Sequence, residues 1–203
     1  MFDSYPKAAY ETLDRLAYHD DFYRHLANAS TLDKLERGQR FQEHGFPSWE
    51  AFATGRWNQA LALAGERRAH YAEQIRDAQS RGRTERRLRV VQYPITPYVQ
   101  WEMHVLRVRV DVGDNIRVLD ARTIAEVEQH HLVPEVVILG DTVMYGVQYD
   151  KDGNAAGARR YTDQTVIEET QDGFNALYRR GEDFLEFFYR EITPLDAPEL
   201  HDQ

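Results

Sequence analysis

The chain has 203 residues, of which 42% are hydrophobic and 12% aromatic, and its formal net charge is -9. This composition suffices for a good-sized folded domain and argues against wholesale disorder. The absence of cysteine excludes disulfides, thiolate metal sites and a cysteine nucleophile, and the negative charge disfavours broad binding to nucleic acids.

The sequence contains no indication of a membrane segment. No apolar run approaches the roughly 20 residues that span a bilayer. The N-terminus lacks the basic start and apolar block of a signal peptide. We therefore expect no membrane partner, and a cytoplasmic location by default.

The first eighty residues are predicted to be helical. Apolar residues recur at helical spacing through several stretches, and serines, glycines and a proline separate these stretches. The predicted helices cover residues 7–29, 31–37, 48–55 and 57–79. Residues 1–80 are therefore expected to form a helical N-terminal region.

Residues 81–203 are predicted to form an α/β domain that ends in an acidic amphipathic helix. Apolar runs bounded by turn residues predict strands at residues 87–93, 116–119, 136–139, 142–150 and 156–161. Helices are expected at residues 98–110 and 123–131 and after Asp163, although the alternation of residues 105–110 also permits a strand. The expected fold class is α+β, a mixed four- to five-stranded sheet flanked by helices, in one compact unit with the N-terminal region.

Charged residues are unevenly distributed along the chain. Residues 81–122 hold nine arginines against five acids, whereas residues 163–203 hold eleven acids against three arginines. The two regions either complement each other or leave one facing a charged partner. Contact with phosphate or nucleic acid is an option for Arg81, Arg83, Arg86, Arg87 and Arg89, but we expect them to pair with the acidic last helix.

Two clusters contain residue types that bind metals. Asp21 and His25 are four residues apart and would share a helical face, as a carboxylate–histidine pair at a divalent metal does. Glu126 and His130 have the same spacing. Each pair makes at most half a site, so we favour a surface ion pair for the first and a solvated helix end for the second.

The preferred ligand site directly follows the strand at residues 87–93. If residues 98–110 are helical, Tyr98, Trp101 and Glu102 share one face, and Arg89 precedes them on the strand. Ligands of α/β folds tend to bind where strands end. Beside two aromatic rings, Glu102 could act as an acid or base, with His104 as a neighbour. The alternative, which we favour, is a structural ion pair between Glu102 and a neighbouring arginine.

Several segments resemble a known family. They are Phe52–Gly55, the run Arg87–Val91 followed by Pro94 and Tyr98, the pair Trp101–Glu102, and the run Gly113–Arg117. Together they resemble an uncharacterised actinobacterial family, a domain of unknown function often encoded near helix-turn-helix regulators. Asp114 stands where this family usually has glutamate, and roughly the first fifty residues look like an addition.

The layout of this family resembles the phospholipase D-like half-domain, which serves as a ligand sensor in some regulators. Phospholipase D chemistry needs a histidine with a lysine two residues later. Tyr5, Leu32 and Tyr149 stand two residues before the three lysines of the chain, so that motif is absent. The resemblance therefore implies a domain that lacks this active site.

These observations together predict an accessory or regulatory domain that binds a partner protein or a small ligand, the latter near Arg89, Tyr98, Trp101 and Glu102. The expected partner is a DNA-binding regulator, and a homodimer is a further option; nucleic acid is not expected. The alternative is a small enzyme, metal-dependent or not, that uses Glu102, His104 or His130 with a carboxylate. The sequence does not indicate a cofactor.

Overall fold

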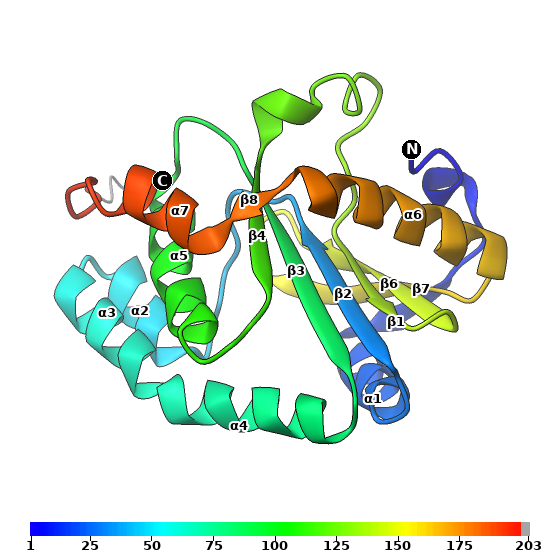
Figure 1. The fold of residues 1–203 in the computed structure, drawn as a ribbon, viewed down its shortest axis with the longest axis horizontal. Coiled ribbons are helices and arrows are strands. Elements are labelled where there is room, and N and C mark those ends of the chain that lie inside the picture. The colour runs from blue at the N-terminus through cyan, green and yellow to red at the C-terminus, as the bar shows by residue number, and fades with distance from the viewer. Residues whose placement is uncertain (200–203) are drawn as a thin grey trace.

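The computed structural model describes residues 1–199 and contains one eight-stranded sheet (Figure 1). Along the sheet the strands follow the order β1-β7-β6-β5-β2-β3-β4-β8. Strands β2, β3 and β4 run parallel to one another, and all other neighbours are antiparallel. The strands are β1 Glu11–Asp14, β2 Thr31–Glu36, β3 Thr84–Val91, β4 Ile116–Asp120, β5 Val136–Leu139, β6 Val143–Tyr149, β7 Ala155–Tyr161 and β8 Glu182–Asp183.

Helices cover both faces of this sheet. They are α1 Arg15–Leu26, α2 Pro47–Ala53, α3 Trp57–Glu66, α4 Arg68–Ser80, α5 Pro97–Val110, α6 Gln164–Arg180 and α7 Phe184–Phe187. Shorter helical turns are η1 Tyr5–Lys7, η2 Ala121–Ile124 and η3 Phe188–Ile192. Among the described residues, none of the helices combines the length and apolar character that crossing a bilayer requires.

Alternate residues of β5 belong to different hydrophobic cores. Val136 and Ile138 lie in the core that contains the buried side of α6, whereas Val137 and Leu139 lie in the core that borders α1. Successive side chains of a strand point to opposite faces, so α6 and α1 cover opposite faces of the sheet.

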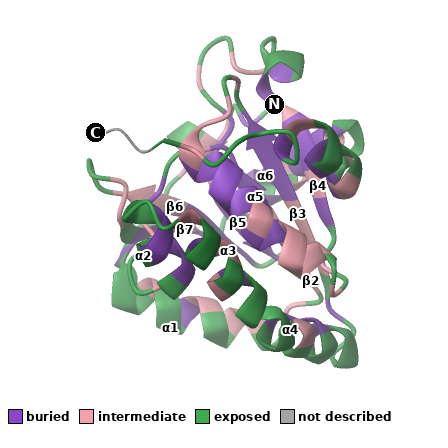
Figure 2. Ribbon diagram, turned by 90° about the vertical axis from the view of Figure 1, so that its left-hand side faces the viewer, coloured by how far each residue is buried: buried purple, intermediate pink, exposed green. Residues whose placement is uncertain are grey.

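Helix α5 lies on the same face as α1. The strand register places Ile116, Arg87, Lys34 and Val137 side by side across β4, β3, β2 and β5. Val137 belongs to the core beside α1, and Ile116 to the core under α5. Most of α5 is buried, whereas α1, α3 and α4 have exposed outer sides (Figure 2).

The expected mixed sheet flanked by helices is confirmed, but the expected number of strands is wrong, since the sheet has eight strands and not four or five. The five predicted strands correspond to β3 to β7. Strands β1 and β8 are only 4 and 2 residues long, which is too short for a recognisable alternation of apolar and polar residues.

Strand β2 replaces the helix predicted at residues 31–37. Its residues Asp33 and Glu36 are buried, with 1% and 5% of their surface exposed. Buried charged residues are tolerated in a central strand when they are paired. A strand that contains them lacks the apolar pattern by which a buried strand is recognised in a sequence. The partners are arginines of β3, because the register places Asp33, Lys34 and Glu36 beside Arg86, Arg87 and Arg89.

The rest of the N-terminal region is also less helical than predicted. The helix predicted at residues 7–29 is replaced by β1 and α1, and the Asp14 carboxylate ends the strand and caps the helix by accepting a hydrogen bond from the Ala17 backbone at 2.8 Å. The single helix predicted at residues 57–79 is two helices, α3 and α4, that meet at Arg67, two residues after the weak helix former Gly65. The helix predicted at residues 123–131 is the short turn η2 followed by a loop.

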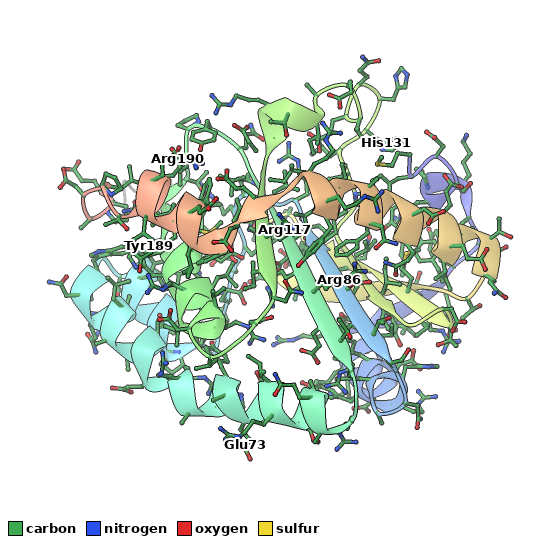
Figure 3. All side chains as sticks on the ribbon, viewed as in Figure 1. Glu73, Arg86, Arg117, His131, Tyr189 and Arg190 are labelled. Atoms are coloured by element: carbon green, nitrogen blue, oxygen red, sulfur yellow. The ribbon has the colours of Figure 1, made fainter. Side chains whose placement is uncertain are left out.

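The arginines of β3 do not pair with acidic residues of the last long helix, which corrects another expectation. Arg86 and Arg117 lie beneath α6 (Figure 3). The guanidinium of Arg86 lies 5.0 Å from the ring centre of Phe174 and donates to Asn175 Oδ1 at 2.9 Å, while both Oδ atoms of Asp33 in β2 accept from it at 2.7 Å. The carboxylate partner of Arg86 thus comes from the adjacent strand.

Candidate functional site

Four charged side chains meet on the α5 side of β2 and β3. Because these strands are parallel and in register, Lys34 lies beside Arg87 and Glu36 beside Arg89. Lys34 Nζ lies 2.6 Å from Glu36 Oε1, and Arg87 Nη1 donates to both Glu36 oxygens at 2.9 Å. Burial raises the pKa of Glu36, but the charges of Arg87 and Lys34 outweigh this effect and hold it well below its ordinary value. We refer to these four residues as the charge cluster.

Glu102 of α5 joins the charge cluster through Arg89. Arg89 is fully buried and donates from Nε to Glu102 Oε2 at 2.7 Å and from Nη1 to the Val90 carbonyl at 2.9 Å. The expected ion pair between Glu102 and a neighbouring arginine is therefore confirmed. Burial raises the pKa of Glu102 to about 7, although the charge of Arg89 lowers it. The Nη2 atom of Arg89 has no hydrogen-bond partner within residues 1–199.

A cleft of about 580 Å³ lies on the same face, beside the charge cluster. One wall comes from α1 and the other from α4, and these helices lie on either side of β2 and β3 at the bottom of Figure 1. Lys34 and Arg87 line the cleft, so it reaches two members of the charge cluster. It borders the N-terminal ends of β3 and β4, and not the C-terminal ends where the sequence places the ligand.

The cleft has an apolar side and a charged side. The apolar side contains aromatic and aliphatic side chains from α1, β2, β5 and β6: Tyr18, Phe22, Leu26, Leu32, Val137, Val147 and Tyr149. The charged side contains the cations Lys34, Arg81, Arg83, Arg87 and Arg109 and the acids Asp77, Glu85 and Asp114. Arg86 also borders the cleft, but its guanidinium lies over Phe174 on the opposite face.

The cations of the cleft are only partly used by protein partners. Arg109 donates from Nε to Asp114 Oδ2 at 2.5 Å and from Nη1 to Gln74 Oε1 at 3.3 Å. Arg87 bonds Glu36 through Nη1 alone, so its Nε and Nη2 have no side-chain partner in the described part of the chain. Five cations face three acids, and the buried Glu36 adds a fourth acid beneath them. The charged side therefore carries a surplus of one positive charge.

Tyr98 and Trp101 lie next to the Arg89–Glu102 pair but do not line the cleft. Trp101 is 2% exposed, stacks on Phe52 with ring centres 5.5 Å apart, and donates from Nε1 to Ser48 Oγ at 3.0 Å. The Tyr98 hydroxyl donates to Glu43 Oε1 at 3.0 Å. All four predicted ligand-binding residues meet within the core between β3, α5 and α2.

The histidines considered for catalysis do not join this arrangement. His104 packs between the rings of Trp57 and Phe188, at centre distances of 5.3 and 5.1 Å, on a side of α5 that does not face Arg89. Burial lowers the pKa of His104, and the charge of Arg107 lowers it further. His130 is exposed on the loop after η2, beside His131 at the top of Figure 3. Glu126 pairs with Arg180 at 2.9 Å and not with His130.

Asp21 and His25 lie together, but the Asp21 carboxylate is occupied by other groups. His25 Nε2 is 3.8 Å from Asp21 Oδ1, while Arg24 Nη2 and the Tyr145 hydroxyl donate to the carboxylate at 2.6 and 2.8 Å. The expected ion pair between Asp21 and His25 is therefore present, but it is not a surface pair on the Asp21 side, because Asp21 is only 3% exposed. Within residues 1–199, no three histidine or carboxylate side chains come together as a metal site requires.

Sequence reasoning did not find the cleft. Four of the five arginines considered for phosphate contact, Arg81, Arg83, Arg86 and Arg87, do line it, but Lys34 lies in a predicted helix and Arg109 is not among the predicted site residues. The available indication was the matched spacing of Lys34 and Glu36 with Arg87 and Arg89, which becomes a pattern only if both segments are adjacent parallel strands.

Comparison with known proteins identifies the family of the chain. No curated protein matches the chain. The region that matches a family begins at residue 20, so the expectation that roughly the first fifty residues are an addition is wrong for residues 20–50. Residues 20–189 match the model of a domain of unknown function, DUF6879, and because this match covers most of the chain, the protein belongs to that family.

Proposed function

We propose that this protein is an accessory or regulatory domain that binds a small ligand in the cleft between α1 and α4. The cleft itself is the observation that carries this proposal. Its volume of about 580 Å³ lies within the range of small-molecule sites, roughly 300–1,000 Å³, and its apolar side adjoins charged side chains that include Lys34 and Arg87.

The proposed regulatory role includes a partner protein that responds to the ligand. A DNA-binding regulator is the partner class we propose, because the sequence resembles an actinobacterial family encoded near helix-turn-helix regulators. The resemblance to phospholipase D-like sensor half-domains supports the same role. The net charge of -9 favours a protein over a nucleic acid as the direct partner.

Ligand binding is better supported than the enzyme alternative. The candidate groups Glu102, His104 and His130 lie in three places, respectively beside Arg89, between two aromatic rings, and on an exposed loop. A general acid or base acts within hydrogen-bond reach of its substrate. None of these three side chains lines the cleft.

Native mass spectrometry after incubation with a small-molecule extract of a bacterial culture tests the proposal. We expect the wild-type protein to keep a discrete added mass and Val147→Trp to lose it, because the larger ring fills the cleft from β6. Leu132→Trp is the matched control, since Leu132 is 60% exposed and does not line the cleft. No added mass on the wild type, or equal retention by Val147→Trp, would contradict the proposal.

A further inference from the structure

We infer that the ligand of the cleft is an organic monoanion with an aromatic or branched aliphatic body, whose oxyanion group meets Arg87 and Lys34. This inference rests on the proposed function, because it specifies what the proposed site binds. It combines three observations, namely the free donors of Arg87, the charge balance of the cleft, and the ring contacts of its apolar side.

The free donors of Arg87 match a planar oxyanion. Its Nε and Nη2 atoms have no side-chain partner in the described chain, and the side chain is 18% exposed where it lines the cleft. A guanidinium presents parallel N–H groups that carboxylate, sulfonate or phosphate oxygens accept in pairs. Lys34, whose side chain is 33% exposed, adds a second cation beside Arg87.

The charge balance of the cleft limits the ligand to a small negative charge. Its cations exceed the acids, with Glu36 included, by one. A second or third negative charge on the ligand would meet Asp77, Glu85 or Asp114 without a matching cation, and like charges in a partly desolvated site repel strongly. A nucleic acid or another polyanion is therefore a poor match.

The apolar side of the cleft is built from rings that other rings hold in place. Tyr149 stacks on Phe41 with ring centres 4.3 Å apart, and Tyr18 contacts both Phe22 and Tyr145 at 6.0 and 5.1 Å. Ring packing of this kind fixes side-chain orientation, so the surface is formed before a ligand arrives. This surface offers flat aromatic rings and branched aliphatic side chains for contact with the apolar body of the ligand.

A pair of fluorescent probes tests the anion and the cleft separately. Anilinonaphthalene sulfonate is a monoanion with an aromatic body, and phenylnaphthylamine has the same body without the sulfonate. We expect the sulfonate to bind the wild-type protein about tenfold more tightly in a fluorescence titration, as one charge-assisted contact supplies. Added sodium chloride is expected to weaken the binding of the sulfonate alone.

Single substitutions show which residues of the cleft contact the sulfonate group. Lys34→Gln is expected to weaken sulfonate binding severalfold and to leave the uncharged probe unchanged, while Arg87 continues to bond Glu36. Lys151→Gln is the control, because Lys151 is a lysine outside the cleft that also pairs with a carboxylate. Val147→Trp is expected to weaken both probes.

The outcomes separate the inference from the proposed function. Equal affinity of the wild-type protein for both probes, with no effect of salt, would overturn the monoanion and leave a cleft that binds neutral ligands. An unchanged sulfonate affinity in folded Lys34→Gln would likewise place the anion elsewhere. Failure of both probes to bind, or binding that Val147→Trp does not reduce, would overturn the inference and the proposed function together.

Discussion

Glu102 lies on the inner side of α5, where its carboxylate meets Arg89 in the protein interior. Burial raises the pKa of this carboxyl from its ordinary value of 4.5 to about 7. Between these pH values the folded protein binds a proton that the unfolded chain has released. The contribution of Glu102 to stability is therefore present at low pH and lost as the pH rises through this window.

We expect Glu102→Gln to remove this pH dependence. The free energy of unfolding of the wild type, relative to the variant, should fall by up to about 1.4 kcal/mol per pH unit between about pH 5 and pH 7. Urea denaturation of both proteins across this range measures the difference. Because the pKa of Glu36 is depressed, its contribution is already complete above about pH 4.5 and adds no slope.

The comparison between the two proteins is needed because other groups titrate nearby. Burial raises the pKa of Glu43 and Glu135, which act in the same direction as Glu102, and lowers that of His104, which acts in the opposite direction. These contributions cancel in the difference between wild type and variant. Glu126→Gln, at an exposed ion pair, serves as the control. Parallel pH profiles of wild type and Glu102→Gln would show that the pKa of Glu102 is not raised.

Among the elements, β2 shows how far the sequence can be used to predict this fold. Strands β3 to β7 were predictable because turn residues bound their apolar or alternating runs, and helix α5 because apolar residues recur along it at helical spacing. In β2 the buried residues include Asp33 and Glu36, and arginines from β3 are main partners that make their burial tolerable. Since those partners are about fifty residues away in sequence, no local pattern indicates the strand.

The candidate site, like the fold, was predictable from the sequence only in part. The Arg89–Glu102 pair was predictable, because a strand followed closely by a helix returns over that strand. The cleft was not, because its walls come from α1 and α4 and its charged side from β2, β3 and the end of α5. Its shape depends on how distant elements pack, and Phe22 or Val147 alone carries no indication of it.

Glu36 is expected to be the most sensitive charged position of β2. Glu36→Gln leaves Arg87 and Lys34 without a carboxylate inside the protein, and breaking a buried ion pair in this way costs about 3 kcal/mol or more. Glu11→Gln on β1, whose own side chain is 58% exposed and whose half-buried partner Arg160 keeps Asp21 as a second carboxylate, should cost about 0.5 kcal/mol. Chemical denaturation of both variants measures the contrast, and equal losses would show that β2 does not depend on this carboxylate.

At the scale of the whole molecule, the N-terminal segment is part of the folded core even though the family match begins later. Phe2 is fully buried in the core beneath α6, and a Cβ at Gly173 would lie 2.7 Å from its ring. Strand β1 extends the sheet by pairing with β7. The residues before position 20 therefore add both a strand and a core side chain to the matched domain.

Phe2→Ala is expected to destabilise the protein by about 3–5 kcal/mol, because it removes a fully buried ring and leaves a cavity beside α6. Thermal or urea unfolding measures this loss. Leu16→Ala provides the comparison, as Leu16 is 72% exposed and its removal should change stability by less than about 0.5 kcal/mol. A Phe2→Ala variant as stable as the wild type would mean that the N-terminal segment does not contribute to the core.

The central position of β2 also determines the order in which the protein can be assembled during synthesis. Its residue Leu32 pairs with Leu139 of β5, and helices α2 to α4 separate it from β3. Contacts between residues so far apart in sequence slow folding, because a long stretch of chain must be closed before they form. On the ribosome, the charged residues of β2 emerge well before the arginines that neutralise them and longer still before β5. Until β3 and β5 have both emerged, β2 cannot take its place in the sheet.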